Sequence, residues 1–165
     1  PKEFIETIIK AGNAAPSGSN VQNWRFVVVQ DQAFQDRLRS LALPRYQRWM
    51  ENAPEKSVKM RKEIDAASSD PIYYNAPVII FVIGSGKTKK YDTPLVCENM
   101  MIAARSMDIG SCYVYFGQLP LNNKDVKKAL EIKDDEEVYG PIVLGYPEDS
   151  FPAAPSKKKP TIKWI

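Results

Sequence analysis

The sequence predicts a single domain, residues 1–165, in which helices cover both faces of a central β-sheet. Strand-like and helix-like segments alternate along the 165 residues, an order typical of sheets layered with helices. Residues 77–84 are almost wholly apolar, so a strand there must be covered on both faces. The length allows the burial of a sizeable hydrophobic core. No internal repeat or second domain is evident.

In the first half of the chain, residues 2–13 carry apolar side chains at helical spacing, and Gly12 near their end is a stop signal. The β-branched and aromatic side chains of residues 24–31 predict a central strand. Asp31 can cap the helix that follows. Residues 44–67, which begin with a proline and are rich in charge, are predicted to be helical.

In the second half, Asp70 begins a short turn that carries two tyrosines. Pro94 fits the first turn of a helix that runs to about residue 106. The chain then turns at Gly110 into a third strand. Residues 122–132 predict an amphipathic helix capped by one of its two leading asparagines. Residues 137–147 predict a fourth strand, which ends in Gly-Tyr-Pro.

The overall charge is mild. The net charge of +3 comes from 23 basic and 20 acidic residues, a balance that argues against a dedicated nucleic-acid binder. No apolar run approaches the roughly 18 residues that span a bilayer, and no secretory signal is visible. We therefore expect neither a nucleic-acid nor a membrane partner. The two cysteines, Cys97 and Cys112, are too few for a disulfide framework and suit a reducing cytoplasm.

The sequence contains no histidine. This absence excludes Ser-His and Cys-His nucleophilic pairs, most catalytic zinc sites and the usual general base near neutral pH. We expect no metal site. If the protein is an enzyme, a cofactor should supply its difficult chemistry.

A run of small and amide side chains, Pro-Ser-Gly-Ser-Asn at residues 16–20, separates the first predicted helix from Trp24 and the first strand. The run offers hydroxyl, amide and backbone donors, and Gly18 would let a ligand approach the backbone closely. Neutral donors in a tight turn suit a phosphate or the edge of a heteroaromatic ring. Since the same residue types are common in ordinary turns, this segment alone leaves both interpretations open.

Together with its surroundings, this segment resembles the signature of the FMN-dependent nitroreductase family. In that family a helix ends in Ala-Pro-Ser, Asn and Gln follow at fixed spacing, and Trp precedes a hydrophobic strand, as in AAPSGSNVQNWRFVVV here. Three further segments resemble the family in its order: YNAPVIIFV, CENMMIAARSMDIGSCYV and PIVLGYPEDSFPAAPSKKKP. The resemblance covers nearly the whole chain.

The resemblance implies an α+β fold with a mostly antiparallel sheet covered by helices. It also implies a homodimer whose extended C-terminal tails, residues 150–165, are domain-swapped between the subunits. The apolar end of this tail, TIKWI, needs a surface to cover it, and a partner subunit is one candidate. An FMN would lie at each subunit interface. The loop facing the flavin held mainly by the other subunit would contribute Pro16, Ser17, Gly18, Asn20 and Gln22.

Two more pairs of cofactor-binding residues follow from the resemblance. Ile109 and Gly110 would offer backbone N–H groups to the N5 and O4 edge of the flavin, where reduction places charge. A helix C-terminus with a left-handed glycine is the alternative interpretation of this segment, and both can hold. Lys157 and Lys158 match basic tail residues that hold the FMN phosphate. A solvated basic terminus is the alternative for these lysines.

The sequence departs from the family at its start. Family members begin with an Arg-Arg-Ser-x-Arg stretch that contributes to FMN binding, whereas this sequence begins at Pro1, just after the place of that stretch. We expect the stretch to exist upstream of Pro1, because its loss would weaken FMN binding. Cys97 and Cys112 are expected to be small buried residues and not redox thiols.

Four aromatic residues could line a substrate slot over the flavin, although aromatics in such numbers more often form a core or an interface. They are Tyr46, Trp49, Tyr73 and Tyr74. We assign none of them a catalytic role.

The resemblance implies an FMN-dependent oxidoreductase. NAD(P)H would reduce the flavin at N5 and leave, and a nitroaromatic, quinone or similar conjugated acceptor would then take the electrons in ping-pong order. No side-chain acid or base is required, so no catalytic residue is expected. One alternative is a related flavoprotein with another chemistry, such as dehalogenation, dehydrogenation or flavin breakdown. The others are a flavin-binding protein without turnover and a nucleic-acid binder.

Overall fold

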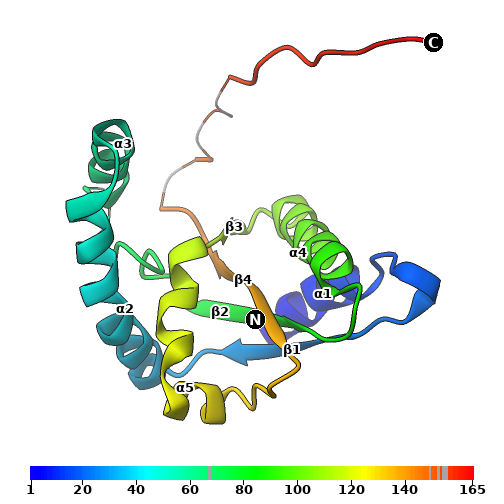
Figure 1. Cartoon of the computed structure of the whole chain (residues 1–165), viewed down its shortest axis with the longest axis horizontal. Helices are drawn as coiled ribbons and strands as arrows, with labels where there is room; N and C mark the ends of the chain where they lie inside the picture. Colours follow the sequence, from blue (N-terminus) through cyan, green and yellow to red (C-terminus); the bar gives the residue numbers. More distant parts are fainter. Residues whose placement is uncertain (67, 149, 152, 154–155) are drawn as a thin grey trace.

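A four-stranded antiparallel sheet forms the centre of the computed structural model, which describes residues 1–66, 68–148, 150, 151, 153 and 156–165 (Figure 1). Each neighbouring pair of strands runs antiparallel. In sheet order, the strands are β1 (Trp24–Val29), β2 (Val78–Gly84), β4 (Glu137–Gly145) and β3 (Gly110–Tyr113). The predicted α+β fold with an antiparallel sheet is confirmed.

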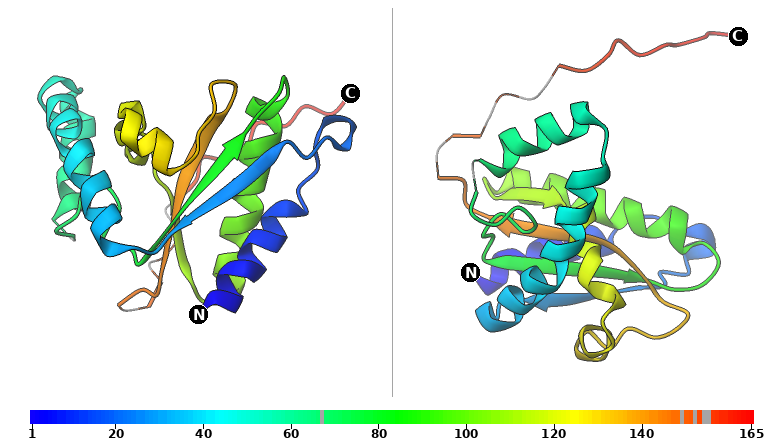
Figure 2. Two further views of the ribbon diagram at one scale, coloured as in Figure 1. Left: turned by 90° about the horizontal axis from the view of Figure 1, so that it is seen from below. Right: turned by 60° about the vertical axis from the view of Figure 1, so that its left-hand side comes forward.

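Helices cover both faces of the sheet (Figure 2). One face is covered by α1 (Lys2–Asn13) and α4 (Lys89–Ser106). The other is covered by α2 (Gln32–Asn52), the 3₁₀ segment η2 (Tyr115–Asn122) and α5 (Lys124–Ala129). Helix α3 (Glu55–Asp65) follows α2 at the outside of this second layer. No helix of the described residues is long and apolar enough to cross a membrane.

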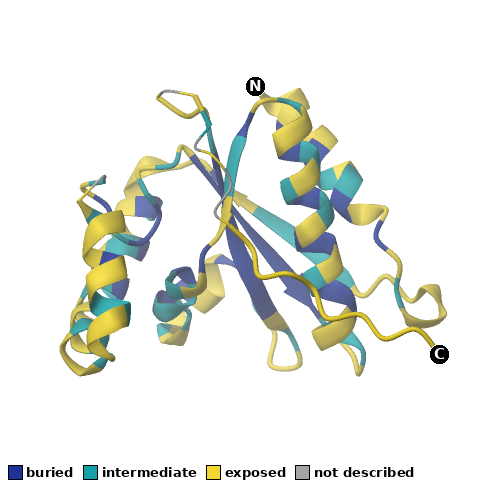
Figure 3. Ribbon diagram, turned by 90° about the horizontal axis from the view of Figure 1, so that it is seen from above, coloured by how far each residue is buried: buried dark blue, intermediate teal, exposed yellow. Residues whose placement is uncertain are grey.

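Strand β2 has both faces buried, as its continuous apolar sequence predicts (Figure 3). Ile80 and Val82 lie in the core under α1 and α4. Ile79 and Phe81 lie in the core under α2 and η2. Successive side chains of a strand point to opposite faces, and each such burial contributes about 1.5–3 kcal/mol. Two cores therefore share one central strand.

Strand β1 lies at an edge of the sheet, so the prediction of a central strand for residues 24–31 is wrong. Trp24 and Phe26 pack against one core, and Val27 and Val29 belong to the other. The two helical layers explain why this strand is apolar on both faces. Strand order does not enter that pattern, because an edge strand between two layers also directs its side chains into both. In β1, however, Val29 is the only one of the six residues that is fully buried.

The helical prediction for residues 44–67 is confirmed over most of its length, but Pro44 is not a helix boundary. Helix α2 continues through Pro44, and the helical break comes at Ala53 and Pro54. Leu38, Ala42 and Tyr46 form one buried stripe at four-residue spacing, while Pro44 lies on the exposed side. Burial of this stripe outweighs the hydrogen bond that the proline cannot donate. The predicted end of the stretch, Ala67, lies outside the described residues.

The local helix signals have mixed outcomes. The Asp31 side chain accepts a hydrogen bond from the N–H of Phe34 at 2.7 Å, and Asn123 caps α5 by accepting from Asp125 and Val126, which confirms both caps. Helix α4, however, begins at Lys89. Pro94 therefore lies in its second turn and not its first, because the preceding turn packs against the end of β2.

Candidate functional site

A groove of about 650 Å³ lies beside the end of β3. It is bounded by β3, by the turn after β4 and by the segment that joins α3 to β2. Among the described residues that line it, Glu148 is the one that carries a charge. The lining residues are Ile64, Ser68, Tyr74, Asn75, Ala76, Pro77, Gly110, Ser111, Cys112, Val143, Gly145, Tyr146, Pro147 and Glu148. A mostly neutral lining suits an uncharged ring better than a highly charged group.

The turn from α4 into this groove differs in detail from the prediction. Asp108, with φ of 54°, takes the left-handed conformation that the alternative interpretation of this segment gives to the glycine. The N–H of Ile109 donates to the carbonyl of Ala104 at 2.9 Å, as expected after a left-handed helix end. That amide is therefore already engaged. Gly110 begins β3, where a β-carbon would lie 3.1 Å from the carbonyl oxygen of Gly145.

The loop predicted to contact the cofactor, residues 16–22, is built from exposed and half-exposed residues. Ser19, Asn20 and Gln22 have φ of 52°, 55° and 50°, a conformation that side chains rarely adopt. Internal hydrogen bonds hold them. The Ser17 hydroxyl accepts from the N–H of Gln22 at 3.0 Å, and the Gln22 amide donates to Asn20 Oδ1 at 2.9 Å.

A buried carboxylate lies behind this loop. The N–H of Gly18 donates to Oδ1 of Asp92 at 3.2 Å, and Asp92 is 7% exposed. A phosphate brought to the same N–H would meet an internal carboxylate and be repelled. Of the two ligands left open by the sequence, the edge of a neutral ring is the better fit to this loop.

The groove and the loop lie at opposite ends of the sheet in one chain. Trp24, just after the loop, pairs with Gly84 at one end of β2. At the other end Val78 pairs with Leu144, next to the pairing of Gly110 with Gly145. Six steps along a strand span about 20 Å. One planar ring could therefore touch both only if they came from two different chains.

Lys157 and Lys158 lie on the C-terminal tail, which projects from the body of the molecule (Figure 1). Both lysines are exposed. Trp164 near the end of the tail is 89% exposed. Within one chain the structure brings these lysines to neither the groove nor the loop.

The two cysteines differ in burial. Cys97 is buried as predicted, and this burial raises the pKa of its thiol to about 12. The prediction of burial is wrong for Cys112, which is exposed on the edge strand β3 and lines the groove. Desolvation raises the pKa of the Cys112 thiol also, against the opposing effect of Arg61. Neither thiol is activated as a redox nucleophile.

Sequence reasoning missed Arg61, which is 7% exposed beside the groove. Its guanidinium donates to the hydroxyl of Tyr46 at 2.9 Å and to that of Tyr74 at 2.7 Å. It also donates to the carbonyl of Pro71 and pairs with Asp65 at 3.1 Å. The i,i+4 spacing of Arg61 and Asp65 was the one available sequence signal.

The aromatic residues singled out in the sequence separate into core and groove positions. Tyr46 is buried and donates to Asp65; burial first, then this hydrogen bond, raise the pKa of Tyr46 to about 12. Tyr73 is buried and donates to the carbonyl of Gly117. Trp49 packs on Tyr46 and Phe116. Tyr74 lines the groove, and because its oxygen accepts from Arg61, its proton can be donated elsewhere.

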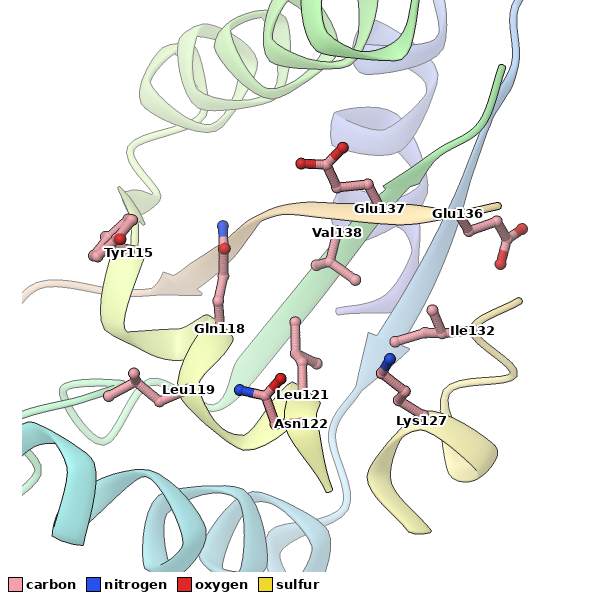
Figure 4. A pocket seen from close by; sticks show the side chains of 10 residues that line it. All are labelled: Tyr115, Gln118, Leu119, Leu121, Asn122, Lys127, Ile132, Glu136, Glu137 and Val138. Carbon is pink, nitrogen blue, oxygen red and sulfur yellow. The ribbon is translucent and has the colours of Figure 1, made fainter. Parts of the chain in front are cut away.

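A second cavity, of about 360 Å³, lies between η2, α5 and β4 (Figure 4). It contains none of the predicted site residues. The carboxylates of Glu136 and Glu137 point to different sides of the cavity (Figure 4), and that of Glu136 is bound to Arg25. Its polar groups do not converge on one point, as those of a ligand site do.

A four-stranded antiparallel sheet between two helical layers, with a largely neutral groove at its edge, defines a nitroreductase-like oxidoreductase. The chain belongs to the Nitroreductase family, whose sequence profile matches residues 1–146. It is 30% identical over 156 residues to a protein of Archaeoglobus fulgidus named "Putative NADH dehydrogenase/NAD(P)H nitroreductase", covering 89% of this chain and 74% of that protein.

Two further comparisons agree with this assignment. The iodotyrosine deiodinase of Thermotoga neapolitana is 25% identical over 158 residues, which cover 94% of this chain and 82% of that protein. The crystal structure of a nitroreductase with bound FMN from Bacteroides fragilis superposes with a TM-score of 0.75 at 25% identity. That superposition covers 100% of this chain and 88% of the other.

Proposed function

We propose that this protein is an FMN-dependent oxidoreductase that acts as a homodimer, with one flavin at each of two equivalent subunit interfaces. The observation that supports it most is the separation of the groove from the 16–22 loop along the sheet. A flavin lying against Gly110 of one chain would be reached by the loop of the second chain. The FMN bound in the similar Bacteroides fragilis nitroreductase supports the choice of cofactor.

The residues on the two surfaces fit a flavin ring. The exposed amide of Asn20 can donate to the polar edges of the ring, where reduction increases negative charge. Gln22, whose amide donates to Asn20 Oδ1 at 2.9 Å, would hold Asn20 in this orientation. Gly110 has no side chain to keep the ring from the β3 backbone. Lys157 and Lys158 would neutralise the phosphate once the tail lies on the partner. Bound FMN would supply the two-electron redox chemistry between NAD(P)H and an acceptor.

We further propose nitroaromatics, quinones and similar conjugated compounds as acceptors. The groove's mostly neutral lining favours uncharged aromatic molecules. The protons can come from solvent, so the chain's lack of histidine is no obstacle. Tyr74 lines the groove, and its oxygen accepts from Arg61.

The tail completes the proposed dimer. Ile162, Trp164 and Ile165 are all exposed in the single chain, and apolar side chains gathered in this way need a surface to cover them. We propose that the tail crosses to the partner subunit, in a domain-swapped arrangement.

The first test measures the flavin content and the oligomeric state of the protein. The purified protein is incubated with excess FMN, freed of unbound flavin and examined by visible absorption and light scattering. We expect about one FMN per chain and a dimeric mass, with steady NAD(P)H oxidation when a nitroaromatic or quinone is added. A colourless monomer would contradict the proposal.

A mixing experiment tests whether two chains share each site. One variant carries Asn20→Ala and Gln22→Ala in the loop, and the other carries Gly110→Leu in the groove. Each variant alone should bind FMN poorly. After the two variants are unfolded and refolded together, about half of the dimers should be mixed, and each mixed dimer has one intact site. FMN binding should therefore return at about one site in four. No restoration would indicate a site within one chain.

Reductive dehalogenation is the second candidate, supported by the similarity to the Thermotoga neapolitana iodotyrosine deiodinase. Release of iodide from iodotyrosine with dithionite as the reductant, together with negligible NAD(P)H oxidation in the presence of nitroaromatics and quinones, would favour it. Fast NAD(P)H turnover without iodide release would favour the first candidate.

A further inference from the structure

We infer that Asp92 is a positioning residue, which holds the 16–22 loop in its ligand-facing conformation by accepting a hydrogen bond from Gly18. The inference rests on the proposed function, since it concerns the loop that would face the flavin of the partner subunit. In this role the Asp92 oxygen accepts a hydrogen bond from the loop, and Asp92 does not itself bind the flavin.

The first observation is the burial of Asp92. This carboxylate lies at the start of α4, is 7% exposed, and accepts from the N–H of a residue 74 positions away in the sequence. Within the described part of the chain, that is its one hydrogen bond to a backbone N–H. Burying a carboxylate with so few partners is costly. A purely structural role could be filled more favourably by an apolar side chain.

The second observation is the strained backbone beyond Gly18. Ser19, Asn20 and Gln22 all have positive φ. Side chains rarely adopt this conformation, and a cluster of such residues persists only where its surroundings hold it. The internal bonds from Gln22 tie the loop to itself. The bond from Gly18 to Asp92 is what ties the start of this strained segment to the body of the protein.

The third observation is the tight junction around this bond. A β-carbon at Gly18 would lie 3.3 Å from Thr88 Cγ2. A β-carbon at Gly84, the last residue of β2, would overlap the Thr93 hydroxyl. The N–H of Ser85 donates to the carbonyl of Asn23 at 2.9 Å. The loop, the end of β2 and the start of α4 therefore pack as one unit, in which Asp92 of α4 accepts from Gly18 of the loop.

The consequence concerns the loop's donors. The orientation of the Asn20 and Gln22 side chains depends on the left-handed backbone that carries them. If Gly18 loses its acceptor, that backbone can relax, and the side-chain amides lose their common direction. FMN affinity should then fall, although Asp92 itself contacts no flavin.

The test compares Asp92→Ala with Asp92→Asn, which keeps an accepting oxygen but not the charge. Without FMN, hydrogen exchange of residues 14–24 should be about tenfold faster in Asp92→Ala and near wild type in Asp92→Asn. Exchange in β2 should be unchanged in both. The FMN dissociation constant should rise about tenfold in Asp92→Ala only. Asp36→Ala, which removes an exposed carboxylate of α2, is the matched control.

Substitutions at Gly18, the donor of the same hydrogen bond, keep the inference testable if Asp92→Ala misfolds. Gly18→Pro removes the donor, while Gly18→Ala keeps the donor and adds only the β-carbon. Gly18→Pro should change loop hydrogen exchange and the FMN dissociation constant as much as Asp92→Ala does. The double variant should show no larger change in either quantity, because both substitutions remove the same hydrogen bond. Three results would overturn the inference. They are additive effects of the two substitutions, loop hydrogen exchange that does not change in Asp92→Ala, and FMN binding by Asp92→Asn that is as weak as that of Asp92→Ala. If wild type binds no FMN, the proposed function fails, while hydrogen exchange still decides the role of Asp92.

Discussion

Gly12 of α1 lies directly against Met100 of α4. A β-carbon at Gly12 would lie 2.5 Å from Met100 Cγ and 3.2 Å from Val96 Cγ1. Helix α1 does end one residue later, at Asn13, where the sequence predicts a stop. The structural reason for the glycine, however, is the close approach of two helices.

Gly12→Ala should therefore destabilise the protein. The gain in helix propensity, about 1 kcal/mol, opposes an overpacking cost of about 1–3 kcal/mol, and the overlap is with a side-chain atom near the backbone of α4. We expect a net loss in the free energy of unfolding measured by urea titration. The double variant Gly12→Ala/Met100→Ala should lose less free energy of unfolding than the two single variants lose together, since Met100→Ala makes room for the new methyl group.

Asp108→Gly should stabilise the protein by about 0.5–1 kcal/mol. Asp108 has φ of 54°, which glycine adopts without a steric penalty. The change removes an ion pair with Arg105, but that pair is on the surface and contributes little. Thermal unfolding provides the measurement. The same change at Asp36, inside α2, should lower stability by about 0.3 kcal/mol through helix propensity, in addition to the loss of the Asp36–Arg39 pair. A gain at both positions would contradict the explanation.

Glu136→Gln should reduce stability at neutral pH but not in strong acid. Two hydrogen bonds from Arg25, of 2.8 and 2.6 Å, outweigh burial and lower the pKa of Glu136 from 4.5 to about 2. Because the folded pKa is the lower one, this stabilisation is complete above pH 4.5 and is lost as the pH falls toward 2.

We expect Glu136→Gln to cost about 1–3 kcal/mol at pH 7. Urea unfolding at several pH values should show the difference from wild type shrinking between pH 4.5 and 2. Glu6→Gln is the control, because Glu6 forms an exposed i,i+4 pair with Lys2. A difference that is constant over this pH range would contradict the assignment.

Arg61→Met should destabilise the protein by about 3–5 kcal/mol, because it leaves Asp65 and two tyrosine hydroxyls without their shared donor. Arg61→Lys should recover only part of this loss, since an ammonium cannot reproduce the planar fork. Limited proteolysis should show new cleavage between α2 and β2. The neighbouring exposed Lys62→Met should change stability by less than about 0.5 kcal/mol.

Lys157→Ala and Lys158→Ala should each weaken FMN binding about tenfold if the tail holds the phosphate of the cofactor, as proposed. Binding of riboflavin, which has no phosphate, should be unchanged. Fluorescence titration of both flavins makes the comparison, with Lys163→Ala as the control. Equal losses for FMN and riboflavin would point to a structural role for the tail lysines.

Much of the local structure was predictable from the sequence. The caps at Asp31 and Asn123 form as expected, because a capping side chain bonds to N–H groups two or three residues away. The apolar run of β2 predicts its double burial for the same local reason. The order of the segments, taken with the loop that ends in Asn and Gln, indicates the family.

The failures occur where burial overrides a local rule. Pro44 lies inside α2 because the buried stripe on either side of it continues, and Pro94 lies inside α4 because the first turn packs on β2. Asp108, and not a glycine, takes the left-handed turn. At the two prolines, tertiary packing offsets a cost of about 3 kcal/mol that the sequence pattern treats as a boundary.

The sequence by itself determined most of the helices and strands, their order and the types of donor available to a ligand, because each depends on neighbouring residues. Only the tertiary structure decided that Asp92 bonds Gly18, that Arg61 joins two tyrosines, and that the groove and the loop lie at opposite ends of β2. These contacts join residues between 13 and 74 positions apart. They exist because helices and strands must bury their apolar faces together, and no local pattern records which faces meet.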